Sequence, residues 1–310
     1  MTKLHDAPKY VLGIDGGGSR TRAAILNERS AVVGFGEAGP SNIHHVGATI
    51  AQENIGSATQ NALRASGLLM GQPFAAAFFG MAGVATEPER RVIRNIAIAL
   101  KLAPKNHIGV DHDIRIALAG ALGGRDGIVL IAGTGSACYG RRENREARAG
   151  GWGAVLDDSG GGLWLGLQAM KAVLRAEDGR GQKTALRRIL FAELKVKLPR
   201  ELIFLAADPA ARLKIAATAP KILRAAQAGD SVARAIVARG AAELALLAKT
   251  VARKLKFSRG VSIALVGGLS TEVIYTRAIH RDLRRSLPNC DIVKTVNPPA
   301  IGAAMLAMKL

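Results

Sequence analysis

The stretch Tyr10–Leu26, YVLGIDGGGSRTRAAIL, contains an apolar segment that ends in Asp15 and is followed at once by three consecutive glycines. Two hydroxyl residues, Ser19 and Thr21, come next, and the chain then turns apolar again. This pattern predicts two short strands joined by a tight turn. Because glycine lets the backbone approach a ligand closely, with successive N–H groups pointing inward, the turn is a candidate phosphate cradle.

A second segment, GIVLIAGTGSACYGRR at 127–142, repeats this pattern of apolar segment, glycine and hydroxyl turn, and return segment. One such hairpin is often an ordinary turn, but two of them, each opening one half of the chain, indicate an internal duplication. One nucleotide held between two phosphate turns would explain both. Only the first turn has an acid at the strand end, so Asp15 is either a carboxylate for Mg²⁺ carried on the phosphates or a turn-forming residue.

Length and composition favour two domains in a cytoplasmic protein. A chain of 310 residues with 49% hydrophobic residues is long enough for two cores of ordinary size. Its apolar runs are shorter than the roughly 20 residues that span a bilayer. The segment MTKLHDAPKY at the start lacks the apolar centre of a secretory signal, and two cysteines provide no disulfide framework.

The formal net charge of +19 fits a nucleic-acid surface, attraction of anionic metabolites, or an arginine-rich solvated exterior. Basic residues are spread along the chain, and aromatic residues for base stacking make up only 4%. The solvated exterior is therefore the favoured interpretation, with no nucleic-acid partner. The positive field would still attract a nucleotide phosphate, as a rate effect weakened by salt.

Hydrophobic periodicity predicts an α/β protein. The expected elements are, in chain order, a three-stranded meander over 10–39, a helix over 49–69, a strand over 74–83, a helix over 87–100, a strand over 107–113, a helix over 114–122, the second hairpin over 127–142, a mainly helical region over 163–256, a strand and turn over 262–270, and a helix over 300–310. The chain contains no Walker phosphate loop, dinucleotide fingerprint, G-x-S-x-G elbow or H-E-x-x-H motif.

Three motifs occur in a characteristic order: GIDGGGSRT, LIAGTGSACYG and IALVGGLS. In them the chain resembles, over nearly its whole length, the BadF/BadG/BcrA/BcrD-type ATPase family, in the N-acetylglucosamine and glucosamine kinase branch of the superfamily that includes sugar kinases and actin. The resemblance implies two RNase H-like lobes with a central nucleotide cleft for ATP and Mg²⁺. The matching positions are Gly16, Gly17, Gly18, Ser19 and Thr21 in the first phosphate motif, Gly133, Thr134, Gly135 and Ser136 in the second, and Gly267 and Gly268 in the adenosine motif.

The resemblance also implies the lobe boundaries and the sugar contacts. The first lobe is expected at 1–115 and the second at 116–296, with a terminal helix at 297–310 that can pack back on the first lobe. The segment AGPSNIHHVG is similar to the family segment whose asparagine contacts the sugar, which falls on Asn42. GGWGAVLDDSGGGLWLG is similar to the segment whose aspartate does so, which falls on Asp158. Trp152 either stacks on the sugar or belongs to the core.

Two departures from the family pattern occur at this site. His112-Asp113 replaces the usual Asn-Asp, and DDSGG replaces the usual G-D-E-G-S, with Asp157 in place of the first glycine and Ser159 in place of the glutamate. The second departure leaves the preferred amino sugar open, because this loop lines the sugar pocket in the relatives.

Asp113 is the candidate general base, since a sugar hydroxyl needs a nearby carboxylate to accept its proton. Its alternative role is the N-cap of the helix that follows, and Asp111 is the alternative base. His44 and His45 adjoin the sugar loop as loop residues or sugar contacts, because neither has a second ligand pair at metal spacing. Cys138 is expected to be a small buried hydrophobe.

The sequence therefore predicts a cytoplasmic kinase that transfers the γ-phosphate of ATP to the 6-hydroxyl of N-acetylglucosamine or glucosamine. Its expected partners are an amino sugar and ATP, with no membrane partner and a homodimer as one option. The alternatives are an ATPase that activates a 2-hydroxyacyl-CoA dehydratase through an iron–sulfur cluster, for which Cys138 and Cys290 would be the only cysteines, and a non-catalytic sugar-sensing protein.

Overall fold

The computed structural model describes residues 10–71, 73–258 and 260–310. Residues 1–9, nearly all of the segment inspected for a secretory signal, lie outside the described residues. The chain divides into two compact units, one formed by the chain up to Arg125 together with Thr295–Leu310, the other by Asp126–Lys294. None of the described helices is long and apolar enough to cross a membrane.

The first unit is built on a five-stranded sheet in the order β3-β2-β1-β4-β5. Its strands are β1 (Val11–Gly16), β2 (Thr21–Leu26), β3 (Val32–Ala38), β4 (Ala76–Met81) and β5 (Ile108–His112). The first three form the expected antiparallel meander, while β4 and β5 extend the sheet in parallel. The glycine turn therefore joins β1 to β2, at the carboxyl end of β1.

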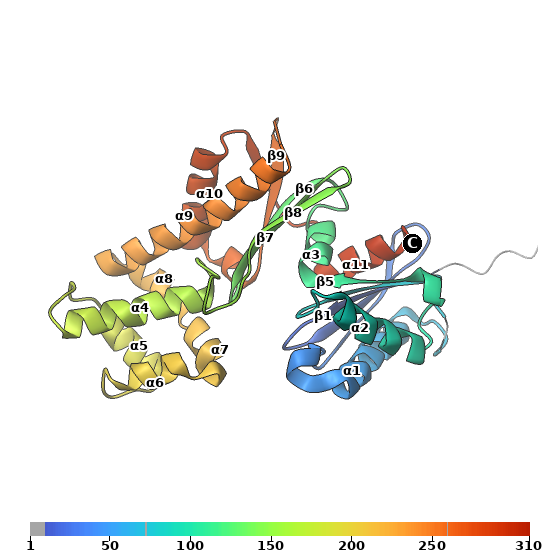
Figure 1. Cartoon of the computed structure of the whole chain (residues 1–310), viewed down its shortest axis with the longest axis horizontal. Coiled ribbons are helices and arrows are strands. Elements are labelled where there is room, and N and C mark those ends of the chain that lie inside the picture. Colours follow the sequence, from blue (N-terminus) through green and yellow to red (C-terminus); the bar gives the residue numbers. More distant parts are fainter. Residues whose placement is uncertain (1–9, 72, 259) are drawn as a thin grey trace, which may run out of the picture. The chain divides into compact units, whose positions relative to one another are not determined.

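Helices cover both faces of this sheet. One face packs against α1 (Ile43–Ser66) and α2 (Glu87–Ala99), and the other against α3 (Asp113–Ala121) and α11 (Pro299–Ala307) (Figure 1). A short 3₁₀ helix, η1 (Lys105–His107), precedes β5. Alternation along β1 accounts for this division, because Leu12 and Ile14 belong to the α1/α2 core while Val11 belongs to the other core. A Cβ at Gly13 would overlap the backbone of α11, so this glycine permits the close packing.

The first unit ends at Arg125 instead of at residue 115, the boundary that the sequence predicted. The reason is that α3 packs on α11, with Ile116 and Ala119 in the same core as Ala303 and Ala304. The chain returns to this unit at Thr295, just before the terminal helix α11.

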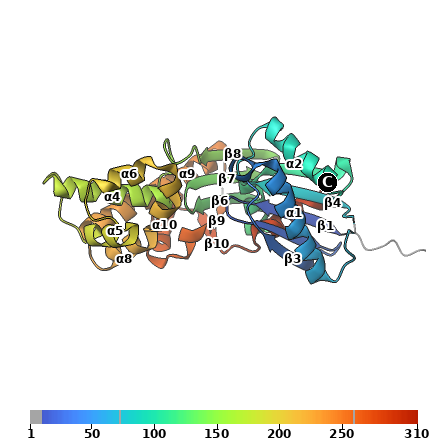
Figure 2. The ribbon, with the colours of Figure 1, turned by 90° about the horizontal axis from the view of Figure 1, so that it is seen from below.

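The second unit has a five-stranded sheet in the order β10-β9-β6-β7-β8. Figure 2 shows these strands one beside the next, from one edge of the sheet to the other. Its strands are β6 (Gly127–Ala132), β7 (Ser136–Arg142), β8 (Arg145–Gly150), β9 (Val261–Val266) and β10 (Cys290–Val293). Here too the first three strands form an antiparallel meander, and the last two continue the sheet in parallel. The two sheets thus share one topology, which confirms the predicted duplication.

The segment between β8 and β9 is helical, as the sequence predicted. It contains α4 (Gly162–Glu177), α5 (Leu186–Leu194), α6 (Glu201–Ala207), η2 (Pro209–Ala211), α7 (Arg212–Ala216), α8 (Ala219–Gln227) and α9 (Ser231–Lys254), and β9 is followed by η3 (Gly268–Thr271) and α10 (Val273–Ser286). One hydrophobic core runs from the sheet into these helices.

Helix α1 begins earlier than the sequence predicted, at Ile43 instead of residue 49. Its first turn is capped by Asn42, whose side chain accepts a hydrogen bond from the backbone N–H of His44 at 3.0 Å. Gly47 then interrupts the helix with φ 76° and ψ 169°. The sequence between Asn42 and this kink is therefore a separate turn, which bears two histidines.

Candidate active site

The first phosphate turn is held by the segment that follows β3. The carbonyl of Gly17 accepts hydrogen bonds from the backbone N–H groups of Ser41 and Asn42, at 3.0 and 3.2 Å. The hydroxyl of Thr21 lies 2.7 Å from both the Gly39 carbonyl oxygen and the Ser41 hydroxyl. Because Thr21 is fully buried, its role is to position the turn and not, as the sequence suggested, to contact the nucleotide.

Asp15 stands at the end of β1 with its side chain only 18% exposed, and its carboxylate lies 3.8 Å from the Arg22 guanidinium of β2. Burial raises the pKa of Asp15 to about 6; the Arg22 charge opposes this shift, and the negative charge of Asp113 adds to it. The carboxylates of Asp15 and Asp113 are thus close enough to repel each other. A cation beside Asp15 would offset both the burial and the repulsion.

Asp113 is the first residue of α3, and the helix is capped by its neighbour. The N-cap is His112, whose ring Nδ1 accepts a hydrogen bond from the backbone N–H of Arg115 at 3.2 Å. The alternative assignment of Asp113 as the N-cap is therefore wrong. The half-buried Asp113 carboxylate instead sits at the carboxyl end of the sheet, near Asp15.

Asp111 forms the centre of a buried ion-pair cluster. It accepts hydrogen bonds from Arg115 at 2.6 Å, from Arg90 at 3.2 Å, and from the backbone N–H of His112 at 2.8 Å. Burial alone would raise the pKa of Asp111, but the hydrogen bonds from Arg115 and His112 outweigh it and hold that pKa below its usual range. A carboxylate so firmly paired is a poor proton acceptor, so Asp111 is a structural residue and not the alternative base.

The capping turn of α1 places polar side chains beside the first phosphate turn. Asn42 is buried, and its amide packs against Gly83, where a Cβ would lie 2.8 Å from the Asn42 Oδ1. The His44 ring Nε2 lies 2.9 Å from both the Gly83 carbonyl oxygen and the Glu89 carboxylate. His45 is exposed, and its Nδ1 would lie 3.4 Å from a Cβ at Gly18.

The second phosphate turn is tied to the start of α4. The Gly133 and Thr134 carbonyls accept hydrogen bonds from the backbone N–H groups of Gly162 and Leu163, at 2.8 and 2.9 Å. The buried Ser136 hydroxyl donates to the Ser159 carbonyl at 2.8 Å. These bonds order the turn against the start of α4.

Asp158 lies directly against this second turn. A Cβ at Gly135 would come within 2.5 Å of the Asp158 carboxylate. Burial raises the pKa of Asp158, a shift that the hydrogen bond from the Ser136 backbone N–H partly offsets. The Ser159 carbonyl accepts the hydrogen bond from the Ser136 hydroxyl. The departure from the family pattern at Asp157 and Ser159 therefore lies beside the second phosphate turn.

Trp152 is 75% exposed, so its alternative role as a core residue is wrong. It lies on the loop after β8 between two glycines with positive φ, Gly151 and Gly153. The Arg148 guanidinium lies 5.8 Å from the centre of its ring. Val155 and Leu156 on the same loop are also exposed. This loop, which leads to Asp158, therefore exposes three apolar side chains, one of them an aromatic ring beside an arginine.

The adenosine motif and the second phosphate turn meet in one pocket. Gly267 has φ 101°, and a Cβ there would lie 2.5 Å from the Ala132 carbonyl, so only glycine lets the end of β9 lie against the end of β6. The resulting cavity of about 270 Å³ is lined by Gly133, Thr134, Gly162, Leu213, Ala216, Ala217, Pro220, Gly268 and Leu269. The four α7 and α8 residues in it were not predicted, since nothing in an alanine-rich helical stretch marks which of its residues line a pocket.

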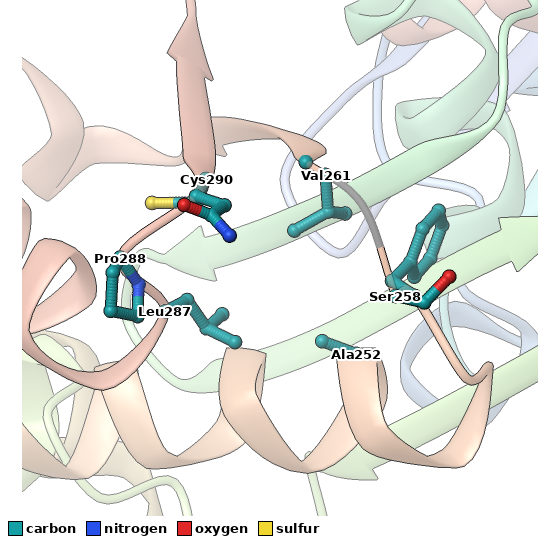
Figure 3. A pocket seen from close by; sticks show the side chains of 9 residues that line it. Ala252, Ser258, Val261, Leu287, Pro288 and Cys290 are labelled. Atoms are coloured by element: carbon teal, nitrogen blue, oxygen red, sulfur yellow. The ribbon is translucent and has the colours of Figure 1, made fainter.

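A second cavity, of about 120 Å³, lies between the end of α9, the start of β9 and the loop before β10 (Figure 3). The described residues that line it carry no acidic or basic side chain, and they include Cys290. Cys138 is fully buried in β7, as expected, and burial raises the pKa of both thiols. Nowhere in the described chain do three or more histidine, cysteine or acidic residues form a metal cluster.

Comparison with known proteins identifies the family. The model of the BadF/BadG/BcrA/BcrD ATPase family matches residues 12–307. The chain belongs to this family. The resemblance seen in the three motifs is therefore confirmed.

Two curated members of the family are similar over almost the whole chain. The N-acetylmuramic acid/N-acetylglucosamine kinase of Clostridium acetobutylicum is 34% identical over 306 residues, covering 96% of this chain and 98% of that protein. The N-acetyl-D-glucosamine kinase of Dictyostelium discoideum is 29% identical over 310 residues, covering 96% and 97%.

Solved structures confirm the actin-like ATPase fold. A proposed N-acetylglucosamine kinase from Chromobacterium violaceum has a TM-score of 0.76 at 25% identity and covers 96% of this chain and 99% of that one. A glucokinase from Streptomyces griseus, solved with glucose and AMPPNP, has a TM-score of 0.61 at 17% identity, covering 98% and 100%. The predicted α/β class with two RNase H-like units is thus confirmed.

Proposed function

We propose that this protein is an ATP-dependent amino-sugar kinase that transfers the γ-phosphate of ATP to the 6-hydroxyl of N-acetylglucosamine or glucosamine. The observation that carries the proposal is the pair Asp15 and Asp113. Two mutually repelling carboxylates lie at the carboxyl end of one sheet, beside a glycine turn, in a chain whose relatives include curated amino-sugar kinases.

Asp113 is the proposed general base. As the sugar O6 bonds to the γ-phosphorus and the bond from that phosphorus to the ADP oxygen breaks, the 6-hydroxyl proton moves to the Asp113 carboxylate. His112 supports this role because it, and not Asp113, caps α3. Asn42, buried beside the turn, is the proposed sugar contact in the first unit.

Asp15 is the proposed metal residue, and its buried carboxylate fits a hard cation held directly or through water. Mg²⁺ bound with ATP would neutralise the charge that develops on the phosphates. The turn of Gly16, Gly17 and Gly18 is the proposed phosphate cradle, together with the Ser19 hydroxyl. Within it the Gly17 N–H donates to the Arg20 carbonyl at 2.9 Å, which closes the turn.

The second unit supplies the remaining proposed contacts. The turn of Gly133, Thr134 and Gly135 would contact phosphates, and the pocket that continues from it to Gly268 would hold the adenosine. Asp158 would accept hydrogen bonds from sugar hydroxyls, and Trp152, exposed beside it, would stack on the sugar ring. Ser136 orders the turn through its bond to Ser159.

One panel tests the proposal. ATP consumption is measured with N-acetylglucosamine, glucosamine, N-acetylmuramic acid, glucose and N-acetylmannosamine, with and without Mg²⁺, beside a control without sugar. We expect turnover that needs both Mg²⁺ and an amino sugar, with the 6-phosphate detected by ³¹P NMR. Hydrolysis of ATP at the same rate without sugar would refute the kinase and favour an activating ATPase.

The same preparation tests the rest of the proposal. We propose the cytoplasm as the compartment, because free ATP is the phosphoryl donor, and a homodimer as the assembly. Light scattering after gel filtration distinguishes the dimer from a monomer. A brown preparation with reducible cluster absorbance would support the iron–sulfur alternative instead.

A further inference from the structure

The pocket beside the second phosphate turn has one wall formed by the junction of α7 and α8. Leu213, Ala216, Ala217 and Pro220 give this wall an apolar surface. Apolar contact stabilises any flat base by burying its faces, but an apolar pocket discriminates weakly between ligands of similar shape. If the pocket distinguishes one base from another, a backbone polar group must do so.

The Ala216 carbonyl is such a group, because the sequence removes its usual partner. The chain passes from α7 to α8 in right-handed helical conformation, with φ and ψ of −64° and −13° at Ala217 and −74° and −17° at Thr218. In a continuous helix the Ala216 carbonyl would accept a hydrogen bond from the N–H of residue 220. Residue 220 is proline, which has no N–H and whose ring crowds the carbonyl four residues before it.

The Ala216 carbonyl oxygen is directed at the opposite wall of the pocket. A Cβ at Gly162 would lie 3.2 Å from this oxygen. The neighbouring carbonyls on that wall, of Gly133 and Thr134, already accept the hydrogen bonds from the start of α4. The Ala216 carbonyl is thus an acceptor beside the cavity that lacks its helical i+4 donor.

We propose that the Ala216 carbonyl accepts a hydrogen bond from the exocyclic amino group of adenine, and that Pro220 keeps it available for this bond. The inference rests on the proposed use of ATP and adds the basis of its selection. Hypoxanthine and guanine carry a carbonyl oxygen in place of that amino group. This oxygen would face the Ala216 carbonyl oxygen, and neither atom could donate a hydrogen bond to the other. An acceptor that loses its partner, and faces a second acceptor instead, lowers affinity, here by about 10-fold to 100-fold.

The apolar surroundings favour the base over the ribose as the donor. Leu213 and Pro220 flank Ala216 on the same wall, and they suit the face of a purine better than a hydroxyl-bearing sugar. A ribose hydroxyl is the competing donor, so the experiment includes a nucleotide that lacks it.

The first measurement is calorimetric titration of the full chain with ADP and with IDP in the absence of sugar. These two nucleotides differ only in the group at position 6 of the purine and the ring protonation that accompanies it. We expect ADP to bind about 10-fold to 100-fold more tightly than IDP. Equal binding of the two would overturn this inference and leave the kinase proposal standing. Failure of ADP to bind at all would overturn both.

The second measurement repeats the titrations with Pro220→Ala, which supplies an N–H one helical turn beyond the Ala216 carbonyl. Alanine is a strong helix former, so the fold is expected to persist. We expect the ratio of IDP to ADP dissociation constants to fall to within about 3-fold of unity, because the carbonyl then has a donor in the helix. A ratio that stays at the wild-type value would overturn the role of Pro220.

Pro209→Ala is the matched control. Pro209 is exposed at the start of η2 in the same unit and does not line the pocket, so its replacement should leave the ratio unchanged. Titration with 2′-deoxy-ADP and 3′-deoxy-ADP completes the design. Suppose that one deoxy nucleotide, and not IDP, bound more weakly than ADP to the wild type, and that this difference disappeared in Pro220→Ala. The carbonyl would then bind the ribose, and the assignment to adenine would be wrong.

Discussion

The two glycine turns occupy equivalent positions in two sheets of the same topology, yet their surroundings differ in chemistry. At the end of β1 the residue before the turn glycines is Asp15, paired across the sheet with Arg22, whereas the corresponding part of β6 has Ile131 paired with Ala137. The first turn lies near a second carboxylate, Asp113. The second opens into an apolar pocket. The two units therefore share a fold but differ in the side chains that surround their glycine turns.

This difference teaches that a phosphate turn by itself does not define a catalytic centre. In both units the turn is rich in glycine, and backbone N–H groups can bind an anion but move no protons. Proton transfer and metal binding need carboxylates. Asp15 and Asp113 interact electrostatically at the first turn, whereas Asp158 lies against the second. Substitutions in one unit that leave the function of the other unchanged test this difference between the two turns.

The largest expected effect is that of Asp113→Asn in the first unit. We expect kcat to fall by about 10²-fold to 10⁴-fold, while the dissociation constants of ATP and sugar change little, because the amide cannot accept the hydroxyl proton. Steady-state kinetics combined with calorimetry measure the two quantities. Asp111→Asn is the control: it should destabilise the fold through loss of the bonds to Arg90 and Arg115 but leave the kcat of the folded protein near wild type. The reverse result would return the base to Asp111.

Asp15→Asn should raise the Mg²⁺ concentration that turnover needs and, in the free protein, increase stability. The folded chain binds the Asp15 proton more tightly than the unfolded chain does, since the pKa rises from 3.8 to about 6. The stability that this proton contributes is present below pH 3.8 and is lost as the pH rises through about 6. Asparagine should therefore stabilise by about 2–3 kcal/mol at pH 7.5 and by almost nothing at the acid end.

Chemical denaturation in the presence of a chelator, at several pH values, measures this difference. A constant difference between Asp15→Asn and wild type across the pH range would contradict the raised pKa. A corresponding polar substitution at the second turn, Ile131→Asn, introduces an amide at a mostly apolar position and should destabilise at every pH.

Asp158→Ala tests the half-buried carboxylate that lies against the second turn. We expect the KM for sugar to rise about 10-fold to 100-fold, since sugar hydroxyls lose an acceptor worth about 1–3 kcal/mol, while the KM for ATP changes much less. The comparison of both KM values in one preparation is the measurement. An equal rise in both would mean that Asp158 serves the phosphate turn, through its contact with Gly135, and not the sugar.

The smallest expected effect on stability is that of Trp152→Ala. Because this side chain is 75% exposed, its removal should change the free energy of unfolding by less than about 0.5 kcal/mol. The KM for sugar should still rise if the ring stacks on the substrate. Thermal denaturation and sugar kinetics separate the two effects, and a large loss of stability with unchanged kinetics would show that Trp152 supports the loop only.

Local sequence determined the strands, the turns and the duplication. Alternating and buried apolar segments require a sheet face to pack against, and three glycines in a row require a turn, whatever surrounds them. The same reasoning placed Asp15 at a strand end and Gly267 in the turn after a strand. These features depend on the conformational preferences of a few neighbouring residues, so the sequence alone was sufficient to predict them.

Only the tertiary structure decided which polar groups are available. From the sequence, Asp111 and Asp113 are two acids on one strand end, but Arg90, which pairs with Asp111, lies far away along the chain. In the same way Thr21 is buried by the segment after β3, Ala216 and Pro220 reach the second phosphate turn from a helix remote in sequence, and α3 belongs to the first unit because it packs on the terminal helix. Availability depends on burial and on partners brought together by folding, and no local pattern records either of them.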